Sequence, residues 1–279
     1  MNKYTKPLSG SEIWVSRPDG TQIYTRKAGQ GAQTIIFAHG YGFDMSEWNL
    51  IWAELLKEDF TLIAFDQMGH GKTSIGKNGI SSSAMSADYK TILEFYDVKN
   101  AVLVAHSMGT FLAMKFMIDY PEIVKERLKS CLLMSAFAGE ANKQNFQNRF
   151  QIPLIQTGIL FQLFKIKAIG HAFVKSILGE NPQNDMIEAF LQMFTTQNHK
   201  ALIPILLAFV RESYYSQLHQ ITLPTAIVIG TRDKTTPPFH TQDLNNNIPN
   251  SYVVRLPNKG HCLNWEASEA IINEIKRLM

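Results

Sequence analysis

Cysteine is scarce in this sequence, with two residues in a chain of 279. Cys131 lies in an apolar run typical of a β-strand, and Cys262 follows the last such run. Two cysteines placed in this way do not give the spacing of a disulfide framework. We therefore expect a protein of a reducing compartment.

Long uninterrupted apolar segments are also missing. No run of 18 apolar residues occurs, so the sequence predicts no membrane-spanning helix. Residues 1–20 contain charged and turn-forming residues but not the apolar core of a secretion signal. From these two absences we expect a cytoplasmic protein.

A strong net charge is absent, because 27 basic residues stand against 24 acidic ones and the formal charge is +3. Without interleaved basic and aromatic residues, this balance predicts no nucleic-acid partner. Gly71-Lys72-Thr73 ends like a phosphate-binding loop, but the glycine required five residues before Gly71 is Asp66, whose charge would repel phosphate. Neither a dinucleotide fingerprint nor a His-Glu-x-x-His zinc pattern occurs, so we predict no cofactor and no metal.

Strand-like and helix-like segments alternate along much of the chain. An N-terminal hairpin is expected first, with strands at 12–16 and 21–27 on either side of Pro18-Asp19-Gly20. Further strand patterns lie at 34–38, 61–65, 101–105, 130–135, 225–230 and 252–256, and helical patterns lie at 45–56, 84–96 and 110–120. This alternation predicts an α/β fold, with a mostly parallel sheet covered by helices on both faces.

A serine stands at the corner between a predicted strand and a predicted helix, in Ala105-His106-Ser107-Met108-Gly109. A corner this tight strains the backbone of its central residue and needs small residues two positions before and after it. The strain exposes the Ser107 hydroxyl to a base. The Met108 amide, at the start of the helix, would stabilise a developing oxyanion. The pattern predicts an acyl-transfer site.

Two further residues complete a predicted triad. Asp233 follows the strand pattern at 225–230, and His261 follows the one at 252–256. We expect His261 to take the proton of Ser107 and return it to the leaving group, while Asp233 orients the imidazole. The strand at 34–38 leads into His39-Gly40-Tyr41-Gly42, where the Tyr41 amide would be the second oxyanion donor, and each such donor is typically worth about 3 kcal/mol.

With these motifs in order, the sequence resembles the α/β-hydrolase-fold serine hydrolases of the esterase and lipase type. The matching segments are HGYG (39–42), DQMGHG (66–71), AHSMG (105–109), GTRD (230–233) and GH (260–261), and the resemblance covers residues 30–279. It implies an α/β-hydrolase fold, a Ser-His-Asp triad and an acyl-enzyme. Ala105 departs from the pattern, because many relatives carry glycine there; a methyl group is usually tolerated.

Other interpretations of these residues remain open. Asp233 is alternatively a turn residue that caps the helix from Pro238, with Glu140 as the nearest substitute acid. His261 is alternatively a surface loop residue. We interpret His39 and His106 as residues that order loops by hydrogen bonding, and Asp66 as a structural residue that bonds loop amides. Cys262 as a nucleophile lacks the strand-to-helix corner.

Residues 139–219 interrupt the alternation with a mainly helical pattern and are predicted to form a cap between two core segments, 1–138 and 220–279. The cap holds eight of the 17 phenylalanines, and 141–179 contains no acidic residue. Its phenylalanines are Phe146, Phe150, Phe161, Phe164, Phe173, Phe190, Phe194 and Phe209, and the basic residues of the acid-free stretch are Lys143, Arg149, Lys165, Lys167 and Lys175. Two interpretations stay open: simple packing and solvation, or an apolar substrate with a lipid surface outside.

The predicted function is hydrolysis of a carboxylic ester, with an apolar or monoacyl substrate as the first expectation. The same apparatus serves amidases, lactonases, thioesterases and carbon–carbon bond hydrolases. Haloalkane dehalogenases and epoxide hydrolases of this fold use an aspartate nucleophile, so Ser107 argues against both. A second hypothesis is a ligand sensor on the same fold, which hydrolyses slowly while its cap recruits a protein partner.

Overall fold

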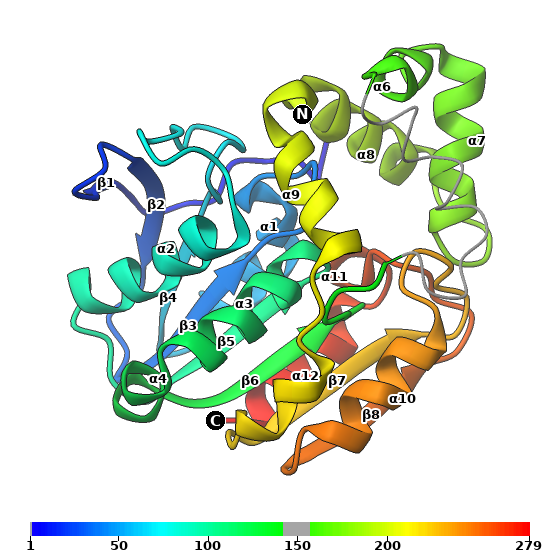
Figure 1. The fold of residues 1–279 in the computed structure, drawn as a ribbon. Coiled ribbons are helices and arrows are strands. Elements are labelled where there is room, and N and C mark those ends of the chain that lie inside the picture. The colour runs from blue at the N-terminus through cyan, green and yellow to red at the C-terminus, as the bar shows by residue number, and fades with distance from the viewer. Residues whose placement is uncertain (1, 142–156) are drawn as a thin grey trace.

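The computed structural model describes residues 2–141 and 157–279. Within these residues a single eight-stranded sheet runs through the molecule (Figure 1). Its strands are β1 (Ser11–Ser16), β2 (Gln22–Ala28), β3 (Gln33–Ala38), β4 (Phe60–Phe65), β5 (Ala101–His106), β6 (Leu128–Met134), β7 (Thr225–Gly230) and β8 (Ser251–Leu256).

The strand order is β1-β2-β4-β3-β5-β6-β7-β8. β1 and β2 form an antiparallel hairpin at one edge, and β2 pairs antiparallel with β4. All other pairs are parallel. The carboxyl ends of β3 through β8 therefore meet at one edge of the sheet, which is where open α/β sheets place their ligand sites.

Helices cover both faces of the sheet, as the alternation of segments predicts (Figure 1). They are η1 (Met45–Trp48), α1 (Asn49–Leu55), α2 (Ser82–Phe95), α3 (Met108–Asp119), α4 (Pro121–Arg127), α10 (Pro238–Asn247), α11 (Leu263–Glu266) and α12 (Ser268–Arg277). The predicted helix at 45–56 is in fact a 3-10 turn followed by α1, because the Asp44 carboxylate caps the Ser46 amide and starts a tighter turn there.

Alternate residues of the central strands enter two separate cores. Leu103 and Ala105 of β5 pack with Tyr89 of α2 and Phe111 of α3 on one face. Val102, Val104 and other strand residues pack against α1 and α12 on the opposite face. Because a strand turns successive side chains to opposite sides, this continuous apolar sequence buries both faces and fixes the register.

The chain between β6 and β7 is mainly helical where the structure describes it. It contains α6 (Ile159–Leu163), α7 (Lys167–Ile177), α8 (Asn184–Thr196), α9 (His199–Arg211) and the 3-10 helix η2 (Tyr215–Gln220) (Figure 1). The predicted cap residues Lys143, Phe146, Arg149 and Phe150 lie outside the described residues.

The described phenylalanines of this insertion pack together. Phe164 stacks on Phe173 with ring centres 4.0 Å apart, and Phe190 lies 5.6 Å from Phe194. The cluster continues to Phe43, 5.0 Å from Phe190, which belongs to the loop after β3. These ring contacts join the insertion to the site end of the sheet.

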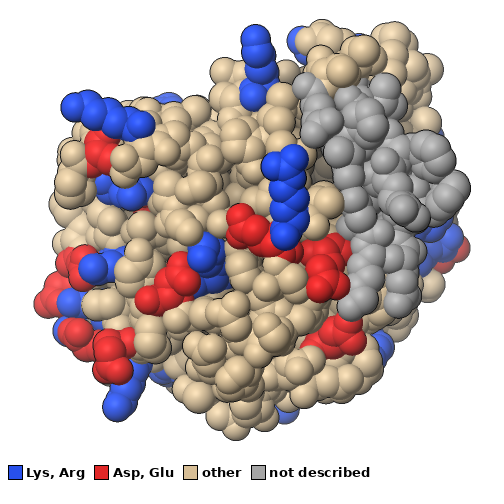
Figure 2. Space-filling view, in the orientation of Figure 1, with Lys and Arg blue, Asp and Glu red and all other residues tan. Residues whose placement is uncertain are grey.

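Charged side chains of both signs are interspersed over the described surface of the face in Figure 2, as expected for a net charge of +3. None of the helices in the described part of the chain combines the length and the apolar character needed to cross a membrane.

Candidate active site

Ser107 occupies the corner between β5 and α3. Its backbone has φ 49° and ψ −115°, a combination that L residues rarely adopt. The Ser107 amide donates to the carbonyl oxygen of Met134 at 3.0 Å, so the neighbouring strand β6 holds the strained residue in place. The side chain is thereby lifted out of the sheet, at the amino end of a helix of 12 residues.

Gly109 allows this corner to form. A Cβ atom at Gly109 would lie 2.5 Å from the carbonyl oxygen of Ala38 and 2.9 Å from that of His39. The start of α3 therefore packs directly on the end of β3, which explains the small residue two positions after Ser107. Ala105, two positions before it, is fully buried in the core.

The three predicted triad residues form a chain of hydrogen-bonding contacts through His261. Nε2 of His261 is 2.9 Å from Oγ of Ser107, and Nδ1 of His261 is 2.9 Å from Oδ2 of Asp233. Glu140, the alternative acid, instead accepts a hydrogen bond from the Ser213 hydroxyl at 2.7 Å. Because Asp233 takes one side of the imidazole, the other nitrogen faces the serine hydroxyl.

Asp233 is held by its own loop. Its Oδ1 accepts from the amides of Thr235 and Thr236 at 2.8 and 3.0 Å, and its Oδ2 accepts from the Thr236 hydroxyl at 2.7 Å. Burial by itself raises the pKa of this carboxyl, but His261 and the Thr236 donors outweigh it and hold the pKa below its usual value. The group is thus an anion at neutral pH, suited to orient and stabilise an imidazolium.

The loop after β3 lies beside the nucleophile. A Cβ atom at Gly40 would lie 2.8 Å from Nδ1 of the His106 ring and 3.4 Å from the Ser107 Cβ, so the site favours glycine there, and Tyr41 follows it. Gly42 has φ 77°, and a Cβ there would lie 2.4 Å from the Phe194 ring of α8. The predicted oxyanion loop is therefore enclosed between the nucleophile and the insertion.

Histidine and carboxylate side chains brace this loop. His39 bonds the carbonyl oxygen of Gly40 through Nδ1 at 2.8 Å and accepts from the Gln67 amide through Nε2 at 2.8 Å. Asp66 accepts from the amides of Met45 and Lys72, each at 2.8 Å. Both side chains thus order backbone in this region, as we interpreted them from sequence.

The cysteines show no sign of a nucleophilic role. Cys262 and Cys131 are both buried, and neither forms a disulfide. Burial raises the pKa of Cys262 well above its ordinary value and that of Cys131 to about 12, so both stay as inert thiols. Within residues 2–141 and 157–279, no group of three or more His, Cys, Asp or Glu side chains is arranged to hold a metal ion.

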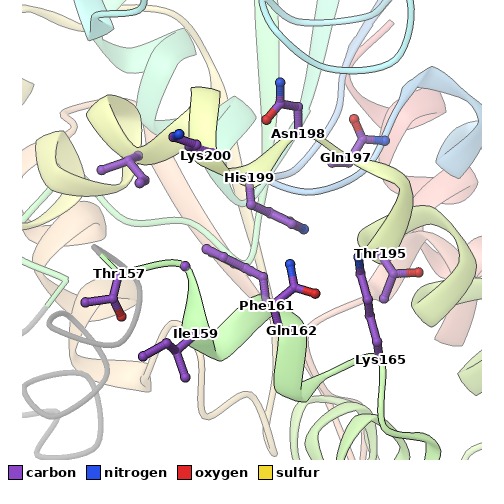
Figure 3. A pocket seen from close by; sticks show the side chains of 12 residues that line it. Thr157, Ile159, Phe161, Gln162, Lys165, Thr195, Gln197, Asn198, His199 and Lys200 are labelled. Carbon is purple, nitrogen blue, oxygen red and sulfur yellow. The ribbon is translucent and has the colours of Figure 1, made fainter.

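A cavity of about 450 Å³ opens within the insertion, between α6 and the start of α9 (Figure 3). His199 and Phe161 stack in its wall with ring centres 4.0 Å apart. Lys165 and Lys200 line it, and none of its described lining residues is acidic. Nδ1 of His199 also bonds the Tyr41 hydroxyl at 2.9 Å, so the cavity wall is connected to the loop after β3.

Two buried residues near the triad were not assigned a contact from the sequence. Glu47 of η1 and His106 of β5 lie against each other beneath Ser107, with Oε2 and Nδ1 at 3.2 Å. The sequence places His106 in the motif but gives no local signal for a partner 59 positions away. Glu47 has the appearance of an ordinary polar residue in a short helix.

A family model described as alpha/beta hydrolase fold matches residues 33–268. The chain belongs to the alpha/beta hydrolase fold family. The matched range of this alpha/beta hydrolase includes all three residues of the hydrogen-bonded set, Ser107, Asp233 and His261. The predicted fold is thereby confirmed.

The chain is also similar to individual proteins and solved structures. The putative non-heme chloroperoxidase of Synechocystis sp. is 26% identical over 257 residues, which cover 89% of this chain and 91% of that protein. Among solved structures, the bromoperoxidase from Bacillus anthracis has a TM-score of 0.83 at 18% identity and covers 96% of this chain and 99% of its own. An esterase from Exiguobacterium antarcticum has a TM-score of 0.81 at 20% identity, with coverage of 96% and 98%. At such identities the solved structures establish the shared fold, so the reaction must be argued from the site.

Proposed function

We propose that this alpha/beta hydrolase is a serine hydrolase that cleaves a carboxylic ester. The observation that carries the proposal is the chain of two 2.9 Å contacts, from Ser107 Oγ to His261 Nε2 and from His261 Nδ1 to Asp233 Oδ2. A hydroxyl at a strained corner, a base that reaches it and a buried anion behind the base are the groups that nucleophilic acyl transfer requires.

The reaction follows from the positions of these groups. The Ser107 hydroxyl attacks the ester carbonyl while His261 takes its proton, and the new imidazolium is stabilised by Asp233. The backbone amides of Tyr41 and Met108 receive the oxyanion. His261 then protonates the leaving alcohol, and a water activated by His261 hydrolyses the acyl-enzyme and restores Ser107.

An apolar acyl group is the proposed substrate element. Support comes from the aromatic cluster that runs from the insertion to the site loops. Its members at the site end are Phe43 and Trp265. The Phe43 ring centre lies 5.0 Å from that of Phe190 and 5.5 Å from that of Trp265. Trp265 follows His261 by four positions. Apolar surroundings of this kind next to the site favour an alkyl chain over a charged one.

The test uses purified protein with p-nitrophenyl butyrate and octanoate and a fluorophosphonate probe. We expect multiple turnovers, faster on octanoate, and covalent labelling at Ser107. Ser107→Ala should abolish both, whereas Ser83→Ala, an exposed serine of α2, should change neither. Asp233→Asn should lower kcat by about 10⁴-fold, because the amide favours the wrong tautomer of the histidine.

The outcomes separate the alternatives. An unlabelled Ser107 would refute the serine mechanism. A single slow turnover accompanied by a ligand-dependent rise in Tm would favour the sensor. Hydrolysis of lactones or thioesters in preference to esters would keep the mechanism and change the substrate class.

We also propose that the surface of α6 and α7 contacts an anionic lipid surface. Ile159, Ile166 and Ile169 are 51%, 52% and 40% exposed, a degree of exposure unusual for large apolar side chains. The exposed Lys165 and Lys167 lie among them in sequence. Apolar side chains with flanking lysines are the features by which helices bind membrane interfaces.

This contact is tested with emulsified esters. Activity should rise when anionic lipid is added to the emulsion, and the rise should disappear when Lys165, Lys167 and Lys175 are all replaced by glutamine. Replacement of Lys57, Lys90 and Lys99, which lie on other helices and loops, serves as the charge-matched control. An equal response in both triple variants would show that these charges are only solvated.

A further inference from the structure

Glu47 and His106 are two ionisable side chains that lie beside the proposed triad without a part in the proposed reaction. Glu47 is 1% exposed and His106 is fully buried. Glu47 belongs to η1, which follows the predicted oxyanion loop, and His106 is the last residue of β5, directly before Ser107. Burying two ionisable groups is costly unless each is paired and hydrogen-bonded, so their contacts need an explanation.

Both ring nitrogens of His106 face oxygen atoms. Nδ1 lies 3.2 Å from Oε2 of Glu47, and Nε2 lies 3.1 Å from the carbonyl oxygen of His261. A carbonyl and a carboxylate only accept hydrogen bonds, so both nitrogens must carry protons if Glu47 is ionised. Burial alone favours the neutral ring, but Glu47 and the His261 carbonyl hold the pKa of His106 above its ordinary value.

Glu47 also binds the loop that carries the predicted oxyanion donor. Its Oε1 accepts from the Gly40 amide at 3.2 Å, one residue before Tyr41. Its backbone carbonyl accepts from Nδ2 of Asn264 at 2.9 Å and from Nε1 of Trp265 at 2.8 Å. Glu47 is therefore bonded both to the loop after β3 and to the helix that follows His261.

His106 binds the other side of the site. The carbonyl oxygen of His261, which faces Nε2 of His106, also accepts from the Ser135 hydroxyl at 2.8 Å. A Cβ atom at Gly40 would lie 2.8 Å from Nδ1 of His106, so the ring packs directly under the oxyanion loop. One ring thus touches the segments that carry the nucleophile, the base and an oxyanion donor.

We propose that Glu47 and His106 form a buried ion pair that positions the oxyanion loop and His261 relative to Ser107. The proposal rests on the serine hydrolase function proposed above. Neither side chain reaches the reacting atoms, so both are positioning residues. Because a misplacement of about 1 Å can cost about 10²-fold in rate, a rigid link between these segments has a large effect on turnover.

Other ionisable groups near His106 are already accounted for. His39 is neutral: its Nδ1 donates a hydrogen bond to the Gly40 carbonyl oxygen, and its Nε2 accepts one from the Gln67 amide. Burial lowers the pKa of His39. Asp233 is bonded to Nδ1 of His261, and its charge raises the pKa of His106 less than Glu47 does. Glu47 is consequently the counter-ion of His106.

Three variants separate charge, hydrogen bonding and general stability. Glu47→Ala removes the contacts with His106 and with the Gly40 amide. Glu47→Gln keeps these contacts. The glutamine carbonyl accepts from the Gly40 amide, and its side-chain amide donates to Nδ1 of a neutral His106. Nε2 of that ring still donates a hydrogen bond to the His261 carbonyl oxygen. Asp88→Asn is the matched control, because Asp88 forms another buried ion pair, with Arg17 at 2.7 Å, on α2.

Kinetics are measured per active site, counted with the fluorophosphonate probe. We expect Glu47→Ala to lower kcat about 10- to 100-fold with KM within about threefold, and Glu47→Gln to recover most of the loss. Asp88→Asn should lower Tm while kcat per labelled site stays at the wild-type value. A kcat per labelled site that is unchanged in Glu47→Ala would overturn the positioning role.

The protonation of His106 is tested independently of activity, in the wild-type protein with ¹⁵N-labelled histidine. At pH 8 the His106 ring should carry protons on both nitrogens, and in Glu47→Gln on one. A singly protonated His106 in the wild type would mean that the shared proton sits on Glu47, which would overturn the ion pair. If His106 is doubly protonated but Ser107 resists the probe, the failure belongs to the proposed function and removes the positioning role with it.

Discussion

The Tyr41 hydroxyl donates a hydrogen bond to Nδ1 of His199, at 2.9 Å, and so joins the loop after β3 to helix α9. The direction of this bond is fixed, because Nε2 of His199 donates to the carbonyl oxygen of Phe194 at 2.6 Å. The same imidazole stacks on Phe161 of α6. A single side chain therefore connects the site loop to two helices of the insertion.

This bond predicts energetic coupling between Tyr41 and His199. Tyr41→Phe and His199→Phe each remove one partner and keep an aromatic ring in place. In a double-mutant cycle by urea unfolding, we expect a coupling free energy of about 1 kcal/mol, typical of one buried neutral hydrogen bond. Strictly additive effects of the two substitutions would show that the bond does not contribute to stability.

His199 also predicts a pH dependence of stability. Burial lowers its pKa from 6.5 to about 4. In the unfolded chain His199 is protonated below pH 6.5, but in the folded protein only near pH 4. Its contribution to the free energy of unfolding is therefore complete above pH 6.5 and falls as the pH drops. Between pH 6.5 and 4, His199→Phe should therefore lose less unfolding free energy than the wild type, by on the order of 3 kcal/mol. The exposed His219→Gln is the control and should follow the wild type.

The strained backbone of Ser107 predicts that a substitution which relieves this strain stabilises the protein. At φ 49° and ψ −115°, a residue with a side chain costs about 1–3 kcal/mol, whereas glycine adopts this region freely. Ser107→Gly should therefore exceed Ser107→Ala in unfolding free energy by about 1 kcal/mol, after the entropy that glycine adds to the unfolded chain. At Ser83, in helix α2, the same pair should show the opposite order. Equal stabilities at Ser107 would argue against stored strain.

Gly109 and Ala105, two positions from Ser107 on either side, are predicted to differ in their tolerance of substitution. Gly109→Ala would bring a Cβ within 2.5 Å of the Ala38 carbonyl oxygen and displace the end of β3. We expect a loss of about 1–3 kcal/mol and slower fluorophosphonate labelling. Ala105→Gly removes one buried methyl group and should cost about 1–2 kcal/mol with labelling retained. Thermal unfolding and labelling rates, measured together, check both expectations.

The sheet was predictable because its strands are short apolar runs with clear boundaries. β7 begins and ends where the pattern at 225–230 does, and β5 extends one residue further, to His106. The short helix α4 was not predicted, since its signal is little more than Pro121 at its first position. The start of α2 at Ser82 depends on the Ser81 hydroxyl, which caps the Ala84 amide. Side-chain capping of this kind moves helix ends by a residue or two.

The site was predictable to the extent that topology determines it. Ser107, Asp233 and His261 each follow a strand of one parallel sheet, and the carboxyl ends of such strands meet. Their catalytic roles remain proposals. The contacts of Glu47 with His106 and of Tyr41 with His199 join residues 59 and 158 positions apart. No local pattern encodes such contacts, because they depend on how loops pack after the sheet has formed.

The insertion leaves and re-enters the sheet at one narrow place. Gly139 forms an antiparallel bridge with Ser213, and the Tyr214 amide donates to the carbonyl oxygen of Ala138 at 2.8 Å. β6 and β7, which the insertion connects, are themselves neighbours. Closing a longer loop between two fixed ends costs only about 0.6 kcal/mol per doubling of its length. Insertions of different length should therefore be accommodated between these two paired segments. Chimeras joined at 139 and 213 should therefore preserve the sheet, but they also exchange the carbonyl oxygen of Ile177, which accepts from the His261 amide at 3.0 Å.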